Sequence, residues 1–197
     1  MSVLILPIAI VVSLFSREIL FLWTQNLITV EHTHLILSIL VIGTALNGLM
    51  NLPYALQVAY GWTKLAFFIN VVSVIVLAPL IFVMTSYYGA VGAASVWVTL
   101  NSGYVLIGIQ LMHRRLLPRE KWRWYVEDLS MPLIAALLTA GLGRFLISGP
   151  MSQTAMLASL VVVSILTLSM SALAAPYIRA WVLNQILQLK LRMTYES

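Results

Sequence analysis

The sequence predicts an all-α integral membrane protein with about six transmembrane helices and an amphipathic C-terminal helix. Of its 197 residues, 61% are hydrophobic and only 9% are charged, whereas a soluble domain has about 25% charged residues. A soluble fold of this length cannot bury so much apolar surface, so lipid must cover it. The apolar residues gather into stretches of about 20, the length with which a helix crosses a bilayer.

Six such stretches form one helical membrane unit over residues 1–175. The first has only 15 residues, 2–16, before Arg17 and Glu18. We interpret it as a span that is cut short at its front end, or as one that continues to Trp23 while the Arg17 side chain reaches the lipid headgroups. Its shortness suggests that the chain is a piece of something larger. The predicted spans are 2–23, 35–59, 66–86, 91–112, 130–148 and 154–175.

Residues 176–197 follow the last span and predict an amphipathic helix on the cytoplasmic surface. Apolar side chains recur at helical spacing from Ile178 to Met193, while Gln185 and Arg192 fall on another side of the helix. We interpret this tail as a membrane-surface anchor.

The eleven Lys and Arg residues predict the orientation of the chain. Short loops rich in Lys and Arg stay in the cytoplasm. Placing the loop 113–129 and the C-terminus there puts nine of the eleven basic residues on that side, and only Arg17 and Arg144 on the other. The net charge of +5 therefore indicates membrane topology, and we expect no nucleic-acid partner.

Two motifs outside the apolar stretches have simple interpretations. The run Glu31–His34, EHTH, could supply metal ligands, but we interpret it as a short extracytoplasmic loop and expect no metal. The run 112–128, MHRRLLPREKWRWYVED, could stack on nucleic acid. In a membrane protein the same composition predicts a connection at headgroup depth. The expected interfacial anchors are Arg114, Arg115, Lys121, Trp122, Arg123 and Trp124.

Features of an enzyme are missing from the sequence. The chain has no cysteine, which excludes disulfides and thiolate chemistry. No Asp, Glu or Lys lies in the middle of a predicted span, and no acid–base pair or activated nucleophile is evident. We therefore expect neither catalysis nor a cofactor.

Polar side chains within the spans supply the functional hypothesis. Asn47, Asn51 and Tyr54 share one face of the second span, and Trp97, Asn101 and Tyr104 repeat the same spacing in the fourth. Polar groups at membrane depth persist where they face a bundle interior or a watery cavity. The predicted residues of a substrate pathway are Asn47, Asn51, Tyr54, Gln57, Asn70, Asn101 and Tyr104.

An alternative is that these amides only join neighbouring helices, which is worth about 0.6 kcal/mol each on average. The repeated pattern favours the cavity, in which Asn51 and Asn101 are solvated and make no bond between helices. Pro53 strengthens this hypothesis, because it removes a backbone donor and frees the Leu49 carbonyl. The second span is therefore predicted to bend at Pro53.

Several stretches of the chain carry a family resemblance. They are FSREILFLWT, LNGLMNLPYALQVAYGWTKLAFFIN, APLIFVMTSYYGAVGAASVWVTLNSGYVLI and MHRRLLPREKWRWY. These stretches resemble the second half of bacterial polysaccharide flippases, the O-antigen-type transporters of the multidrug/oligosaccharidyl-lipid/polysaccharide exporter superfamily. The similarity extends roughly from Phe15 to Tyr125, and its most specific part is Leu52–Thr63.

The resemblance implies one lobe of a two-lobe transporter in the bacterial inner membrane. Alternating access would move an oligosaccharide linked to undecaprenyl pyrophosphate across that membrane, and the seven polar residues would line the wall of the second lobe. The implied partners are this lipid-linked oligosaccharide, membrane lipids and a missing N-terminal lobe or second half-transporter. The alternative is a non-transporting scaffold subunit of a polysaccharide-assembly complex. An O-antigen polymerase or ligase is a weaker third hypothesis, because the external loops are short.

Overall fold

The computed structural model describes residues 1–197 except 117–120, 148, 150, 182–183, 186–187 and 189–197. The described residues are mostly helical and form no strand, which confirms the predicted all-α class. The helices are α1 (Ser2–Leu14), α2 (Ser16–Thr24), α3 (Leu27–Leu49), α4 (Asn51–Ala59), α5 (Thr63–Gly103), the π-helical turn η1 (Tyr104–Gly108), α6 (Ile109–Leu116), α7 (Lys121–Arg123), the π-helical turn η2 (Trp124–Ser130), α8 (Met131–Leu146) and α9 (Gln153–Ala174).

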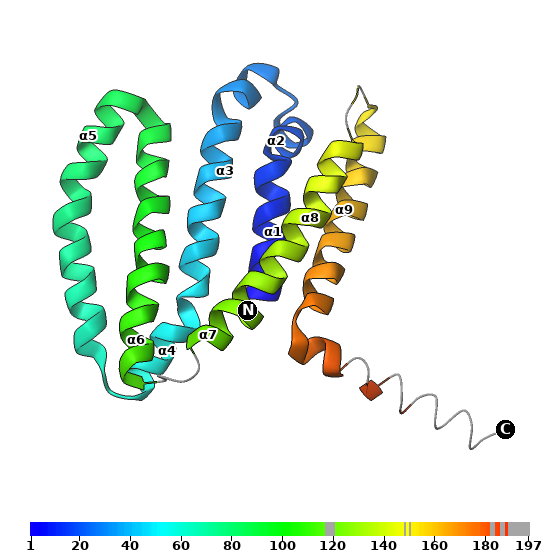
Figure 1. Ribbon diagram of the computed structural model, residues 1–197. Helices are drawn as coiled ribbons and strands as arrows, with labels where there is room; N and C mark the ends of the chain where they lie inside the picture. Colours follow the sequence, from blue (N-terminus) through cyan, green and yellow to red (C-terminus); the bar gives the residue numbers. More distant parts are fainter. Residues whose placement is uncertain (117–120, 148, 150, 182–183, 186–187, 189–197) are drawn as a thin grey trace.

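The helices lie side by side (Figure 1). Helix α3 packs against α5 and α1, and α8 packs against α9 and α1. A core of Val11, Phe15, Ala140, Leu160 and Val163 joins α1, α8 and α9. Figure 1 places α4, α6 and α7 at one end of the helices, here called the α4 end, and α2 at the opposite α2 end.

Helix α5 folds back on itself at Gly89. The backbone there has φ 57° and ψ −142°, a conformation that glycine alone adopts without strain. The turn divides α5 into a first arm, 63–88, and a second arm, 90–103, which run antiparallel in Figure 1. Gly92 allows the arms to begin close together, because an added Cβ would clash with the Met84 carbonyl. The small residues around Gly89 thus form the turn as well as a close contact.

Four helical stretches among the described residues are long and apolar enough to cross a membrane. They are Leu27–Ala59, Ala66–Met112, Trp124–Leu146 and Gln153–Ala174, and the bent pair α1–α2 makes up to five. Large apolar side chains such as Phe82 (76% exposed) and Ile75 (66%) cover their outer faces. Helices with so apolar a surface are stable in the hydrocarbon core of a lipid bilayer. The chain is therefore built as a multi-pass membrane protein.

The first predicted span, 2–23, is broken into two helices. Helices α1 and α2 meet at a bend of 73°, at the fully buried Phe15. The bend has an electrostatic reason, because a straight helix would hold Arg17 and Glu18 within the apolar stretch. In the bent chain Arg17 pairs with Glu31 and Glu18 pairs with Arg144.

The second span begins earlier than predicted. Helix α3 starts at Leu27, so the EHTH run is helical, and the prediction of a loop there was wrong. The Asn26 side chain caps the helix by accepting hydrogen bonds from the backbone N–H groups of Ile28 (3.0 Å) and Thr29 (3.2 Å). Asparagine is a favoured N-cap residue. This signal was present in the sequence.

The predicted loop 113–129 was also wrong for its described residues. Helix α6 continues to Leu116, and the chain is helical again from Lys121 through η2 into α8. The fifth span therefore extends over Trp124–Leu146, whereas 130–148 was predicted. Interfacial side chains such as Trp124 are compatible with a continuing helix, so their composition alone did not indicate a loop.

The last span agrees with its prediction, since α9 covers Gln153–Ala174. Of the predicted amphipathic tail, residues 176–181 are helical. Most of the remaining tail, including 189–197, lies outside the described residues.

Candidate functional site

A pocket of about 160 Å³ opens between α3, α4, the first arm of α5 and η1. We call it the polar pocket. Six of the seven predicted pathway residues line it, and they come from segments as far apart in sequence as α3 and η1. The lining residues are Asn47, Asn51, Tyr54, Gln57, Asn70 and Tyr104, together with Met50, Ala66, Ile69 and Gly108.

One wall of the polar pocket forms where α3 passes into α4. Helix α3 ends at Leu49 and α4 begins at Asn51, next to the position where the sequence places a bend. Pro53 lies in the first turn of α4, where its missing N–H would have no helical acceptor in any case. Across the join, the Met50 N–H donates to the Asn47 carbonyl and the Tyr54 N–H donates to the Met50 carbonyl, each at 2.9 Å. Asn47 and Asn51 thus sit on either side of the junction.

The opposite wall contains the π-helical turn η1. In this turn the Ile109 N–H donates to the Tyr104 carbonyl, so the Val105 carbonyl loses its usual helical donor. The Tyr125 hydroxyl of η2 donates to that carbonyl at 3.0 Å. On the other side of η1, the Tyr104 hydroxyl donates to the Asn70 Oδ1 at 3.3 Å. These two bonds hold η1 between η2 and the first arm of α5.

The polar pocket is chemically neutral. None of the described residues that line it is charged, and its polar groups are amides and phenols. Gln57 is only 3% exposed, and its Oε1 is buried without a hydrogen-bond partner. A buried amide oxygen without a donor costs about 1–3 kcal/mol. The pocket wall therefore contains an acceptor that the described chain does not satisfy.

Asn101 does not belong to the polar pocket, and the prediction that it is a solvated amide was wrong. Its side chain is fully buried. The Asn47 Nδ2 donates to the Asn101 Oδ1 at 2.9 Å, and the Asn101 Nδ2 donates to the Trp97 carbonyl at 2.8 Å. The pair joins α3 to the second arm of α5, beside Gly43, where an added Cβ would clash with Trp97. Close helix approach at this glycine leaves no room for solvent around Asn101.

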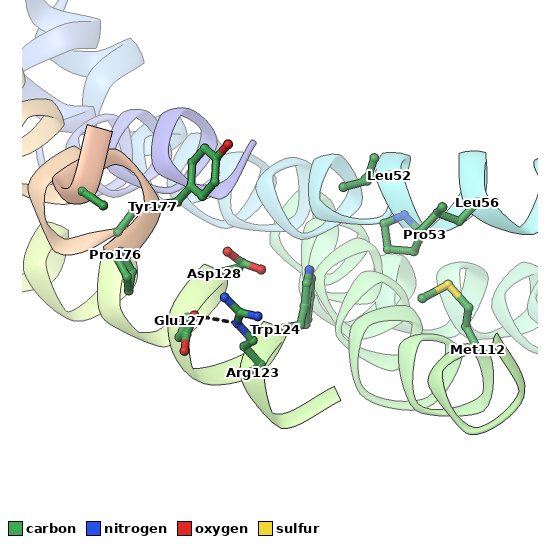
Figure 2. Close-up of a pocket in the computed structure, with 12 residues that line it drawn as sticks. Leu52, Pro53, Leu56, Met112, Arg123, Trp124, Glu127, Asp128, Pro176 and Tyr177 are labelled. Carbon is green, nitrogen blue, oxygen red and sulfur yellow. Dashed lines mark hydrogen bonds and ion pairs between the residues drawn. The ribbon is translucent and has the colours of Figure 1, made fainter. Parts of the chain in front are cut away.

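A larger pocket of about 580 Å³ lies at the α4 end, between α4, α6, the α7–η2 segment and the residues that follow α9. Figure 2 shows the Arg123–Glu127 pair between Leu52 and Pro53 on one side and the Pro176–Tyr177 segment on the other. The Arg123 Nε donates to the Glu127 Oε2 at 3.0 Å. Charge beside an apolar wall is typical of headgroup depth in a membrane.

The predicted interfacial anchors divide between this larger pocket and the surface. Arg123 and Trp124 line the pocket, whereas Trp122 is 73% exposed and Arg114 is also exposed. The side chains of Arg115 and Lys121 lie outside the described part of the chain. Their role as anchors stays a prediction.

Sequence reasoning missed two kinds of site residue. Met50, Ile69 and Gly108 line the polar pocket but carry no polar group that could mark them in a sequence. Glu127 and Asp128 line the larger pocket, and two adjacent acidic residues at the start of a span were a visible signal.

Comparison with protein families, with curated proteins and with solved structures finds no match to this chain.

Proposed function

We propose that this chain is one lobe of a membrane transporter that moves a lipid-linked oligosaccharide across the bacterial inner membrane by alternating access. The observation that carries the proposal is the polar pocket, in which six polar side chains from four helical segments, α3, α4, α5 and η1, converge. Amide and phenol groups suit the hydroxyls of a glycan, which both donate and accept hydrogen bonds. The family resemblance of the sequence supports the same conclusion.

In the proposed lobe, both arms of α5 cross the membrane and α1 with α2 counts as one broken crossing, giving six crossings. The α4 end faces the cytoplasm. The ion pairs support this orientation, because Arg17 and Arg144 at the α2 end are each paired with a glutamate. Lys64, in the first turn of α5, and Arg114, in α6, belong to segments that follow and adjoin α4. A second lobe, from another segment or chain, completes the pathway and holds the undecaprenyl pyrophosphate.

A scaffold subunit without transport is the second candidate. The buried Asn47–Asn101 bond favours it, because such a pair holds two helices together as that alternative requires. The scaffold does not explain Asn51 and Tyr54, which line the pocket while remaining exposed.

The two functions differ in how they respond to substitution of the exposed pocket residues. We expect Asn51→Leu and Tyr54→Leu, introduced into the protein in its native bacterium, each to reduce surface glycan about tenfold, the effect of losing one ligand hydrogen bond of about 1.4 kcal/mol. The lipid-linked glycan should accumulate in the inner leaflet. Surface glycan and the leaflet distribution of the precursor are measured at equal protein level. Tyr87→Leu, at a 79% exposed position that does not line the pocket, is the matched control. Unchanged export in both pocket variants would leave the scaffold as the better account.

A further inference from the structure

An apolar groove of about 500 Å³ runs between the two arms of α5 beside the polar pocket. Its walls are the residues between Phe68 and Leu80 on the first arm and between Thr99 and Leu111 at the end of the second arm and in η1 and α6. Most of the side chains along it are aliphatic or aromatic. Phe68 (63%) and Ile107 (64%) leave their apolar surface uncovered within the chain.

The groove and the polar pocket adjoin. They share Ile69, Tyr104 and Gly108 as lining residues. At this boundary the Tyr104 hydroxyl donates to Asn70, which belongs to the polar side. The same short segment, η1, therefore presents hydrogen-bonding groups to one space and apolar surface to the other.

A neutral polar pocket beside an apolar groove fits an amphiphile with an uncharged polar head. It fits a phospholipid or a free sugar less well. A free sugar has no use for the groove, and a phospholipid places a charged headgroup where the described lining is neutral, which is unfavourable without a counter-charge. The unsatisfied Gln57 Oε1 requires a donor, which a hydroxyl provides.

We propose that the polar pocket and the apolar groove form one binding site for a glycolipid with a single apolar chain. The uncharged sugar occupies the polar pocket, and the chain lies between the arms of α5. The inference rests on the proposed function, which supplies the glycan as the head. Tyr54 and Asn70 are exposed, so the polar pocket is open at its mouth and a sugar can enter it.

Photolabelling of the whole protein in phosphatidylcholine nanodiscs tests the site. The probe is an alkyl β-glucoside with a diazirine in its chain, and labelled positions are mapped by mass spectrometry. We expect labels on 68–80 and 99–111, removed by excess unlabelled alkyl glucoside but not by glucose or by the alkyl alcohol at equal concentration. Equal labelling by a diazirine phosphatidylcholine, or equal competition by the alcohol, would show ordinary lipid contact and overturn the proposal.

Two variants separate the groove from the pocket. An added Cβ at Gly103 meets no atom within 4 Å, so Gly103→Leu should fill the groove without disturbing the fold and weaken competition by the glucoside about tenfold. Gly141→Leu is the matched control, because Gly141 is equally uncrowded and lies in α8. Gln57→Met removes the buried acceptor at similar volume. It should preserve thermal stability and abolish the preference for the glucoside over the alcohol, and a retained preference counts against the proposal.

The inference and the proposed function can fail separately. Loss of export in Asn51→Leu and Tyr54→Leu without specific glucoside labelling would leave a transporter whose glycolipid binds elsewhere. Specific labelling with normal export in those variants would leave a glycolipid-binding protein that does not transport.

Discussion

Gly89→Val is expected to lower the free energy of unfolding by about 1–3 kcal/mol, the cost of holding a side chain in a backbone region reserved for glycine. At φ 57° and ψ −142°, valine cannot relax, because both its chirality and its branched Cβ oppose this conformation. The turn also sets how the two arms of α5 meet. We therefore expect the variant to unfold earlier in a titration with denaturing detergent and to lose the polar pocket with the hairpin.

Gly141→Val provides the control for this substitution. Like Gly89, Gly141 has no atom within 4 Å of an added Cβ, but it lies inside the helix α8, where valine is tolerated better than glycine. The two substituted positions therefore differ in backbone conformation, while neither has an atom that would clash with the first atom of the new side chain. If Gly89→Val unfolds at the same detergent concentration as Gly141→Val, the turn is not the constraint that the backbone angles indicate.

The sequence patterns predicted those features that depend on the chain locally. The span 154–175 is reproduced as Gln153–Ala174, because a long apolar run ended by polar residues permits few alternatives. Asn47, Asn51, Tyr54 and Gln57, which were predicted to lie together, also line one pocket. The junction between α3 and α4 at Met50 keeps them on the same side. Local periodicity was sufficient for both.

Features that depend on contacts between helices were not predicted. The bend at Phe15 is accompanied by Glu31 and Arg144, which pair with Arg17 and Glu18, and no periodicity shows that these residues meet. In the π-helical turn η1, the Val105 carbonyl likewise accepts a hydrogen bond from the Tyr125 hydroxyl, 20 residues away in the sequence. The spacing of residues along the chain does not predict which residues meet when those residues are distant in the sequence.

Asn101 shows most clearly how a contact between helices changes the surroundings of a residue. Seen alone, it repeats the spacing of Asn51, so the same role was predicted for both. The structure buries Asn101 fully and bonds it to Asn47, while Asn51 stays exposed at the pocket. Similar spacing therefore places two asparagines in different surroundings.

We expect Asn101→Leu to reduce the free energy of unfolding by about 1–3 kcal/mol, because the Asn47 amide loses its buried partner. Asn51→Leu should stay within about 0.5 kcal/mol of the parent protein, as is usual for an exposed position, while still impairing export under the proposed function. Detergent unfolding of the two variants, each compared with the parent, measures the difference.

A double-mutant cycle assigns the loss to the Asn47–Asn101 bond. If the bond carries it, Asn47→Leu and Asn101→Leu together should cost less than the sum of the single changes by about 0.5–3 kcal/mol, since either one already breaks the bond. Asn47→Leu combined with Tyr87→Leu should be additive, because Tyr87 is 79% exposed and lies outside the pocket that Asn47 lines. Additive costs for Asn47→Leu and Asn101→Leu would mean that the two amides stabilise the protein independently. The hydrogen bond between them would then not explain why Asn101 and Asn51 differ in their effect on stability.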